Sequence, residues 1–113
     1  MAAQFEYEVT ITSAESPGPW VTLDFHEFHG SLGQVNGKST MVLFTVTPDG
    51  GASGYIETTT ESLDKVYSDP GNLHPVIWTH GTVATTTQSM VWAPTAFRIV
   101  VVAGSLHVSA RGI

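Results

Sequence analysis

Apolar and polar residues alternate with a period of two along much of the chain, which predicts β-strands rather than helices. The clearest example is the segment 5–11, in which aromatic and aliphatic residues alternate with Glu and Thr. The segment 41–47 is an almost continuous apolar run, which predicts a central strand with both faces largely covered. Helical character is confined to Glu61–Ser68, and because this stretch lacks good caps we expect one turn or a loop there.

Further strands are predicted where short apolar or alternating runs lie between turn signals, at 20–25 with an extension towards 29, and at 55–60, 76–79, 82–87 and 89–92. The turn signals include Pro-Gly, Asn-Gly and Pro-Asp-Gly-Gly clusters, which recur about every ten residues. No repeat, linker or low-complexity segment interrupts them. We therefore predict an all-β fold, a jelly-roll-like antiparallel β-sandwich with about eight strands, formed as a single domain over residues 1–113.

The C-terminal segment 97–112 predicts a β-hairpin. Two apolar runs flank Gly104-Ser105, and Gly at the first central position suits a two-residue type II′ turn. We expect one face of this hairpin to be buried against a sheet supplied by the rest of the chain. Counting outwards from the turn gives the apolar cross-strand pairs of that face, which are Ala103–Leu106, Val101–Val108 and Ile99–Ala110.

The same register places Arg98 opposite Arg111 on the other face of the hairpin. Like charges that face each other across a strand pair are unfavourable, and these two residues are half of the four Lys and Arg residues in the protein. An acidic group is therefore expected beside them. Glu6 or Glu8 would supply it if the first strand lies beside the last, and a carboxylate of a neighbouring copy or an anionic ligand is the alternative. Arg98 and Arg111 are thus candidate interface or ligand residues.

Composition narrows the possible partners. The net charge is −6, which argues against binding a nucleic-acid backbone or an anionic membrane surface. Charged residues make up 12% of the chain, about half the usual share, so Thr, Ser, Gly and Asn must form much of the surface. The chain has no cysteine, which excludes disulfides and thiolate metal sites. Its first residues lack the pattern of a signal peptide, so we expect synthesis in the cytoplasm.

Sequence motifs do not predict catalysis. His26-Glu27-Phe28-His29 is a possible metal cluster, but on a strand Glu27 and His29 share one face while His26 points to the other. His74, His80 and His107 are scattered along the chain. No nucleophile elbow or phosphate-binding loop is present. We expect no catalytic residue, no metal and no cofactor, although a metal-dependent sandwich enzyme stays open as an alternative.

The three tryptophans, Trp20, Trp78 and Trp92, have two possible roles. Tryptophan in a small sandwich is usually a core or interface residue, but its flat ring also stacks on sugars. They are therefore candidate interface or ligand residues. A carbohydrate-binding, lectin-like module is the main alternative function, with a glycan as its ligand.

The order of features in residues 39–113 resembles that of small β-sandwich proteins of tailed-phage virions. A Val-rich strand ends in Asp49-Gly50-Gly51, a Thr-rich segment follows, and Pro94 leads into the apolar-Arg-apolar strand Phe97–Val100. The resemblance implies a non-enzymatic virion structural protein, a capsid decoration protein or a tail or neck component. Such a protein assembles with itself, often as a trimer, and with other virion proteins. The chain has few lysines to keep its sheet edges from pairing with other proteins, and such pairing suits a protein that assembles with others.

Overall fold

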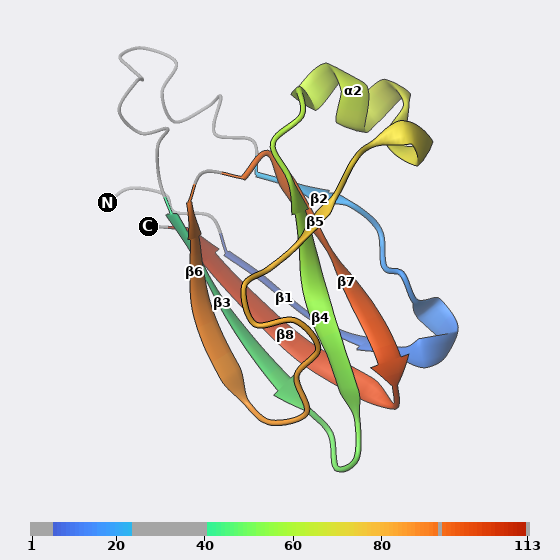
Figure 1. The fold of residues 1–113 in the computed structure, drawn as a ribbon, viewed down its shortest axis with the longest axis vertical. Helices are drawn as coiled ribbons and strands as arrows, with labels where there is room; N and C mark the ends of the chain where they lie inside the picture. The colour runs from blue at the N-terminus through green and yellow to red at the C-terminus, as the bar shows by residue number, and fades with distance from the viewer. Residues whose placement is uncertain (1–5, 24–40, 93, 113) are drawn as a thin grey trace.

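Two four-stranded antiparallel sheets pack face to face, which confirms the predicted sandwich (Figure 1). The computed structural model describes residues 6–23, 41–92 and 94–112. The first sheet has the strand order β1-β8-β3-β6, and the second has β2-β7-β4-β5. The strands are β1 (Glu6–Thr12), β2 (Val21–Thr22), β3 (Met41–Pro48), β4 (Ser53–Thr59), β5 (Val76–Ile77), β6 (Thr87–Trp92), β7 (Ala96–Ala103) and β8 (Ser105–Gly112).

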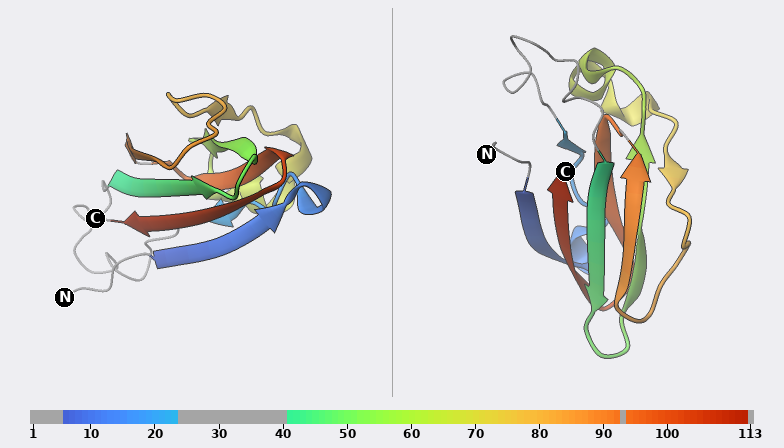
Figure 2. Two further views of the ribbon diagram at one scale, coloured as in Figure 1. Left: turned by 90° about the horizontal axis from the view of Figure 1, so that it is seen from below. Right: turned by 90° about the vertical axis from the view of Figure 1, so that its left-hand side faces the viewer.

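The path of the chain between the sheets is that of a jelly roll. Each pair of consecutive strands changes sheet, except β4 and β5, which lie together in the second sheet. The β4–β5 connection carries helix α2 (Leu63–Ser68) and the 3-10 turn η2 (Pro70–Asn72), and the turn η1 (Ser13–Glu15) follows β1. Figure 2 shows the resulting layers, with the first sheet seen face-on in its right-hand view.

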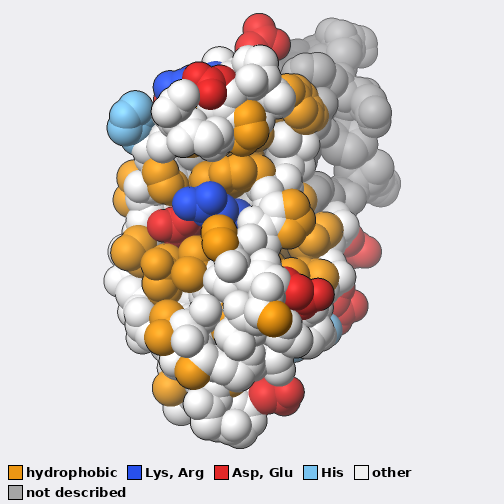
Figure 3. Space-filling view, turned by 90° about the vertical axis from the view of Figure 1, so that its right-hand side faces the viewer, with side chains coloured by type: hydrophobic (Ala, Val, Ile, Leu, Met, Phe, Trp, Pro, Cys, Tyr) orange, Lys and Arg blue, Asp and Glu red, His pale blue; other side chains and the backbone are white. Residues whose placement is uncertain are grey.

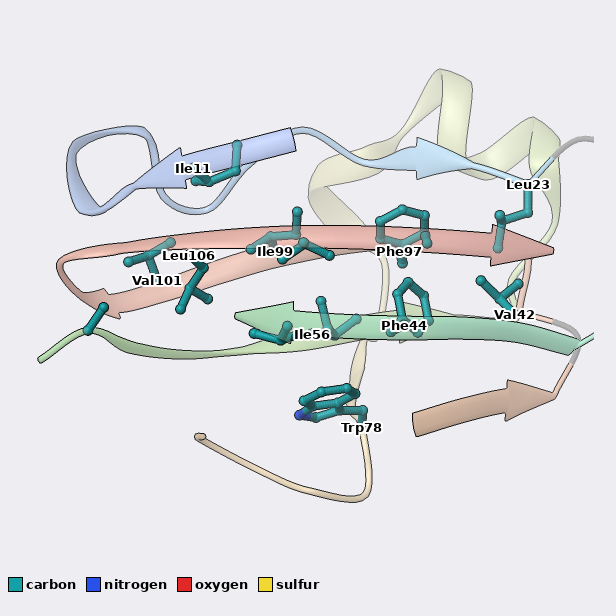
Figure 4. Packing of buried hydrophobic residues seen from close by; sticks show 14 residues of the cluster. Ile11, Leu23, Val42, Phe44, Ile56, Trp78, Phe97, Ile99, Val101 and Leu106 are labelled. Carbon is teal, nitrogen blue, oxygen red and sulfur yellow. The ribbon is translucent and has the colours of Figure 1, made fainter. Parts of the chain in front are cut away.

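The core fills the space between the inner faces of the two sheets (Figure 4). At its centre Phe44 of β3 and Phe97 of β7 meet edge to face, with ring centroids 4.8 Å apart and an interplanar angle of 72°. Both side chains are fully buried. Around them lie the other large inward residues, which include Ile11, Leu23, Val42, Val46, Ile56, Trp78, Ile99, Val101, Leu106 and Val108.

The predicted C-terminal hairpin is wrong, because β7 and β8 belong to different sheets. The chain turns between them at Gly104, which has a φ of +75° and whose carbonyl accepts a hydrogen bond from the Ser13 N–H at 2.9 Å. Of the predicted inward set, Ala103 is exposed, while the rest is buried. Every second residue of a strand points inwards both in a hairpin that buries one face and in two strands of facing sheets. The apolar alternation of residues 97–112 therefore could not distinguish a hairpin from two strands in different sheets.

The other predicted elements have four different outcomes. The strand predictions at 5–11, 41–47, 55–60 and 89–92 are confirmed by β1, β3, β4 and β6. The predicted strand at 82–87 is wrong, because Val83 forms only an isolated bridge with Gly54, and Thr87 alone belongs to a strand, as the first residue of β6. The helix α2 is longer than expected, since Ser62 caps it by accepting a hydrogen bond from the Lys65 N–H. The extension towards 29 and the histidines at 26 and 29 lie outside the described residues.

Strand β3 is central, as predicted, but only its inner face is fully covered. Its residues alternate between buried and half-exposed positions from Met41 to Val46. The other layer of the sandwich lies against the inner face alone, so the outer face keeps access to solvent.

Gly54 on β4 is the glycine whose replacement should disturb this packing most. A Cβ added there would lie 2.4 Å from the Val100 carbonyl oxygen and 2.4 Å from Leu106 Cδ1. Backbone cannot move aside as a flexible side chain can. We expect Gly54→Ala to lower the free energy of unfolding by about 1–3 kcal/mol or more, measured by urea denaturation.

Gly50→Ala is the matched control, because nothing lies within 4 Å of a Cβ added at Gly50. That variant should unfold within about 0.5 kcal/mol of the native protein. Equal stability of the two variants would contradict the close approach at Gly54.

Candidate functional site

The outer face of the β2-β7-β4-β5 sheet is the candidate site, and it is largely apolar (Figure 3). Cross-strand pairing places Ile77 of β5 beside Glu57 of β4, and Glu57 beside Arg98 of β7. Trp20 continues this row, since it precedes Val21, which pairs with Phe97. We call this surface the Arg98 face, and define it by its outward residues Trp20, Tyr55, Glu57, Ile77, Arg98, Val100 and Val102.

The alternation of β7 explains why these residues point outwards. Phe97, Ile99 and Val101 occupy the core, so the residues between them must face away from it. On most antiparallel sheets such outward positions are polar, but here Val100 and Val102 are aliphatic. The side chain of Val102 is 57% exposed. The strand therefore presents apolar residues on both of its faces.

An ion pair lies in the middle of the Arg98 face. Arg98 Nε donates a hydrogen bond to Glu57 Oε1 at 2.7 Å, and the two side chains are 26% and 13% exposed. The Arg98 guanidinium also lies 4.7 Å from the centre of the Trp20 ring, in cation–π contact. The positive charge of Arg98 is thus neutralised inside the chain, and the apolar surface carries no net charge from this pair.

Trp20 connects this row to the helical connection above the sheet. Its ring packs against a small second cluster of buried residues, formed by Val66 of α2, Leu73 and Ala96. The β2 strand is only two residues long, so this packing holds the edge of the Arg98 face in place.

The two arginines singled out from the sequence do not face each other. Arg111 lies on β8 in the other sheet, where its Nη2 is 3.8 Å from Glu6 Oε2 and both side chains are mostly exposed. The predicted register is therefore wrong. The condition for a carboxylate from the first strand is met, because β1 pairs with β8. Glu6 of β1 forms the ion pair with Arg111, whereas Arg98 pairs with Glu57 of β4. The sequence did not indicate Glu57 as that partner.

The three tryptophans lie at three separate places. Trp20 belongs to the Arg98 face, and Trp78 is buried in the core, where its Nε1 donates to the Gly81 carbonyl at 2.8 Å. Trp92 is 66% exposed at the end of β6, on the outer face of the first sheet. They do not form a shared platform on which a sugar could stack.

The β1–β8 edge of the first sheet carries a polar cluster. His107 Nε2 lies 2.9 Å from Glu8 Oε2, and His107 Nδ1 lies 3.0 Å from Thr10 Oγ1. A shallow hollow of about 350 Å³ beside it is lined by Glu6, Tyr7, Glu8, Ser109, Ala110 and Arg111. Within the described ranges, no three His, Asp or Glu side chains are placed to hold a metal ion together.

A second polar cluster surrounds Glu61, at the start of the helical connection. Its carboxylate accepts hydrogen bonds from Lys65 Nζ at 2.7 Å and from the His74 backbone N–H. The hydrogen bond from Lys65, followed by that from His74, lowers the pKa of Glu61 from 4.5 to about 2. These contacts tie α2 to the chain that leads into β5.

Comparison with known proteins identified no matching family model, no matching curated protein and no matching solved structure. Neither α2 nor the 3-10 turns, nor any other helix in the described part of the chain, has the length and apolar character needed to cross a membrane.

The Glu57–Arg98 pair allows a test of how the Arg98 face is held. Glu57→Leu or Arg98→Met alone leaves a partly buried charge without its partner, and should lower the free energy of unfolding by about 1–3 kcal/mol. The double variant removes both charges, so we expect it to recover most of that loss. Urea denaturation of the four proteins measures this. If the double variant lost as much free energy of unfolding as the two single variants added together, Glu57 and Arg98 would not be energetically coupled.

Glu61 predicts a pH-dependent contribution to stability. Because its pKa in the folded protein is about 2 against an ordinary 4.5, the ionised carboxylate stabilises the fold above pH 4.5. That contribution is lost as the pH falls towards 2. We expect Glu61→Gln to lower the thermal unfolding midpoint at pH 7. Below about pH 2, where the native carboxylate is largely protonated, the two midpoints should be similar.

Glu6→Gln is the matched control, since the Glu6 side chain is 70% exposed and lies 3.8 Å from Arg111. It should shift the midpoint little at pH 7, as exposed ion pairs contribute little. A constant deficit of Glu61→Gln at every pH would show that its charge is not what stabilises the fold.

Proposed function

We propose that this chain is a non-enzymatic structural protein of a tailed-phage virion, a capsid decoration protein or a tail or neck component. It binds another virion protein through the Arg98 face. The observation that carries the proposal is an apolar outer sheet face whose central charges, Arg98 and Glu57, already neutralise each other at 2.7 Å. A contiguous apolar face of this kind is typical of protein–protein contact surfaces.

The arrangement of charge on the Arg98 face favours a protein as the ligand. A charge buried on binding is costly unless it has a partner. Arg98 brings its own partner, so another protein can cover this face without supplying a carboxylate. An enzyme site would need charged groups left free to act on a substrate, but here the two charged groups of the face are paired with each other.

The acidic side chains of β1 lie on the opposite layer of the sandwich. Glu6 and Glu8 project from the outer face of the first sheet, where they pair with Arg111 and His107. The outer face of the first sheet therefore carries charged side chains along its β1–β8 side, whereas the charges of the Arg98 face are confined to one internal pair. This asymmetry would orient the molecule when it docks, with the charged β1–β8 side directed away from an apolar partner surface.

The virion setting comes from the resemblance of residues 39–113 to phage structural proteins, and the fold is compatible with it. Jelly rolls are common in viral capsid proteins, and also in lectins and cupins. A fold alone does not decide among these functions. The separate positions of Trp20, Trp78 and Trp92 give less support to the lectin alternative than a common platform would.

The test is whether the protein is part of the particle. Phage particles from a lysate of the host that carries this gene would be purified on a density gradient. We expect the native chain to sediment with them at a constant ratio to the capsid protein. In complementation of a gene deletion, Val102→Lys should reduce incorporation by about tenfold, because the new charge would be buried in the contact.

Thr47→Lys is the matched control, since it adds the same charge at an exposed position on β3 of the other sheet. It should be incorporated like the native chain. Absence of the native protein from purified particles would refute the virion role. Equal incorporation of both lysine variants would refute the Arg98 face as the contact.

A further inference from the structure

The edges of the two sheets differ in how well they are protected. An exposed edge strand offers unpaired N–H and C=O groups to any other strand, and proteins guard against this with short strands or charges. In the second sheet the edges β2 and β5 are two residues long. In the first sheet β1 carries Glu6 and Glu8. The remaining edge, β6, is six residues long and has neither a charged residue nor a proline.

Strand β6 also carries two exposed apolar side chains. Met90 is 47% exposed and Trp92 is 66% exposed. They lie opposite Leu43 and Met41 of β3 in the sheet, so the four side chains form one apolar strip on its outer face. In the described chain β6 pairs with β3 along one side and with no strand along the other. Figure 2 shows β6, in orange, at the border of the sheet.

We propose that β6 pairs with β6 of a second copy of this chain, antiparallel and about a two-fold axis at Met90, so that the Met90 residues of the two copies lie opposite each other. This joins the two β1-β8-β3-β6 sheets into one continuous sheet of two copies. The inference is independent of the proposed function, because it uses another surface than the Arg98 face and holds for any role of the protein.

A second copy fits this edge for two physical reasons. A two-fold contact brings the same strand from each side, and an uncharged strand meets no like charge when it faces itself. It also brings the apolar strips of the two copies, each ending in Met90 and Trp92, side by side over the shared sheet. Burial of these side chains adds to the backbone hydrogen bonds.

The same pairing also limits assembly. Once β6 is paired, the free edge of the joined sheet at either end is β1, which is guarded by Glu6 and Glu8. Growth should therefore stop at two copies. A six-residue strand is about 20 Å long, and its contact is smaller than the roughly 800 Å² per partner of a standard interface. We therefore expect a dimer that dissociates on dilution.

Sedimentation velocity over a concentration series tests the proposal. The native chain should shift from monomer to dimer as its concentration rises through the micromolar range. Met90→Lys places a charge beside its own copy at the two-fold axis, and should keep the protein monomeric at the highest concentration. Thr47→Lys adds the same charge on β3, one residue beyond the last β3–β6 pair and away from Met90, and should dimerise like the native chain.

Cross-linking tests the geometry without relying on the loss of a contact. The chain has no cysteine, so Met90→Cys introduces a single thiol. A short bis-maleimide should join two copies of that variant at a concentration where Thr47→Cys stays uncrosslinked, provided both variants melt like the native protein.

Three outcomes would overturn the proposal. The first is a native chain that stays monomeric at every concentration. The second is self-association that survives Met90→Lys and gives no cross-link through Met90→Cys. The third is loss of self-association in Val102→Lys but not in Met90→Lys, which would show that the copies associate through the Arg98 face. None of these results alters the particle-incorporation test of the proposed function.

Discussion

The edge-to-face contact of Phe44 and Phe97 is the interaction on which the rest of the structure depends. The two rings come from different sheets, and both are completely buried, with 4.8 Å between their centroids. A contact of this kind sets the distance between the sheets and determines which face of β3 and of β7 is inside. Because side chains alternate along a strand, every other position of those two strands follows from it.

The Arg98 face is a direct consequence of that constraint. With Phe97 inside, Arg98 and Val100 must point outwards, and Val102, at the irregularity opposite Ser53 and Gly54, is 57% exposed. The pairing of β7 with β4 then brings Glu57 beside Arg98, and that of β7 with β2 brings Trp20 over the guanidinium. The core therefore positions a neutralised ion pair within an apolar surface. Neither the core nor this surface can change register without the other, because a shift of one residue reverses both.

Much of the strand content could be predicted from the sequence, because alternation is a local property. Around Tyr7, Val42 and Ile56 the apolar pattern of each segment can be read from adjacent residues alone, and each segment forms a strand. Burial was predicted almost as well, since Ile99 and Val108 are apolar at inward positions whichever sheet they join. The helix was underestimated because a single side chain, Ser62, caps it.

Pairing could not be predicted in the same way. The sequence determined on its own that the chain is an all-β sandwich with about eight strands, and which side of each clear strand is apolar, because these follow from the two-residue period of a strand. Whether β7 and β8 share a sheet was decided by the folded chain, through a single turn at Gly104 that carries it from one sheet to the other. The pairing of Glu57 with Arg98 depends on that choice, since two residues 41 positions apart in the sequence must first become neighbours.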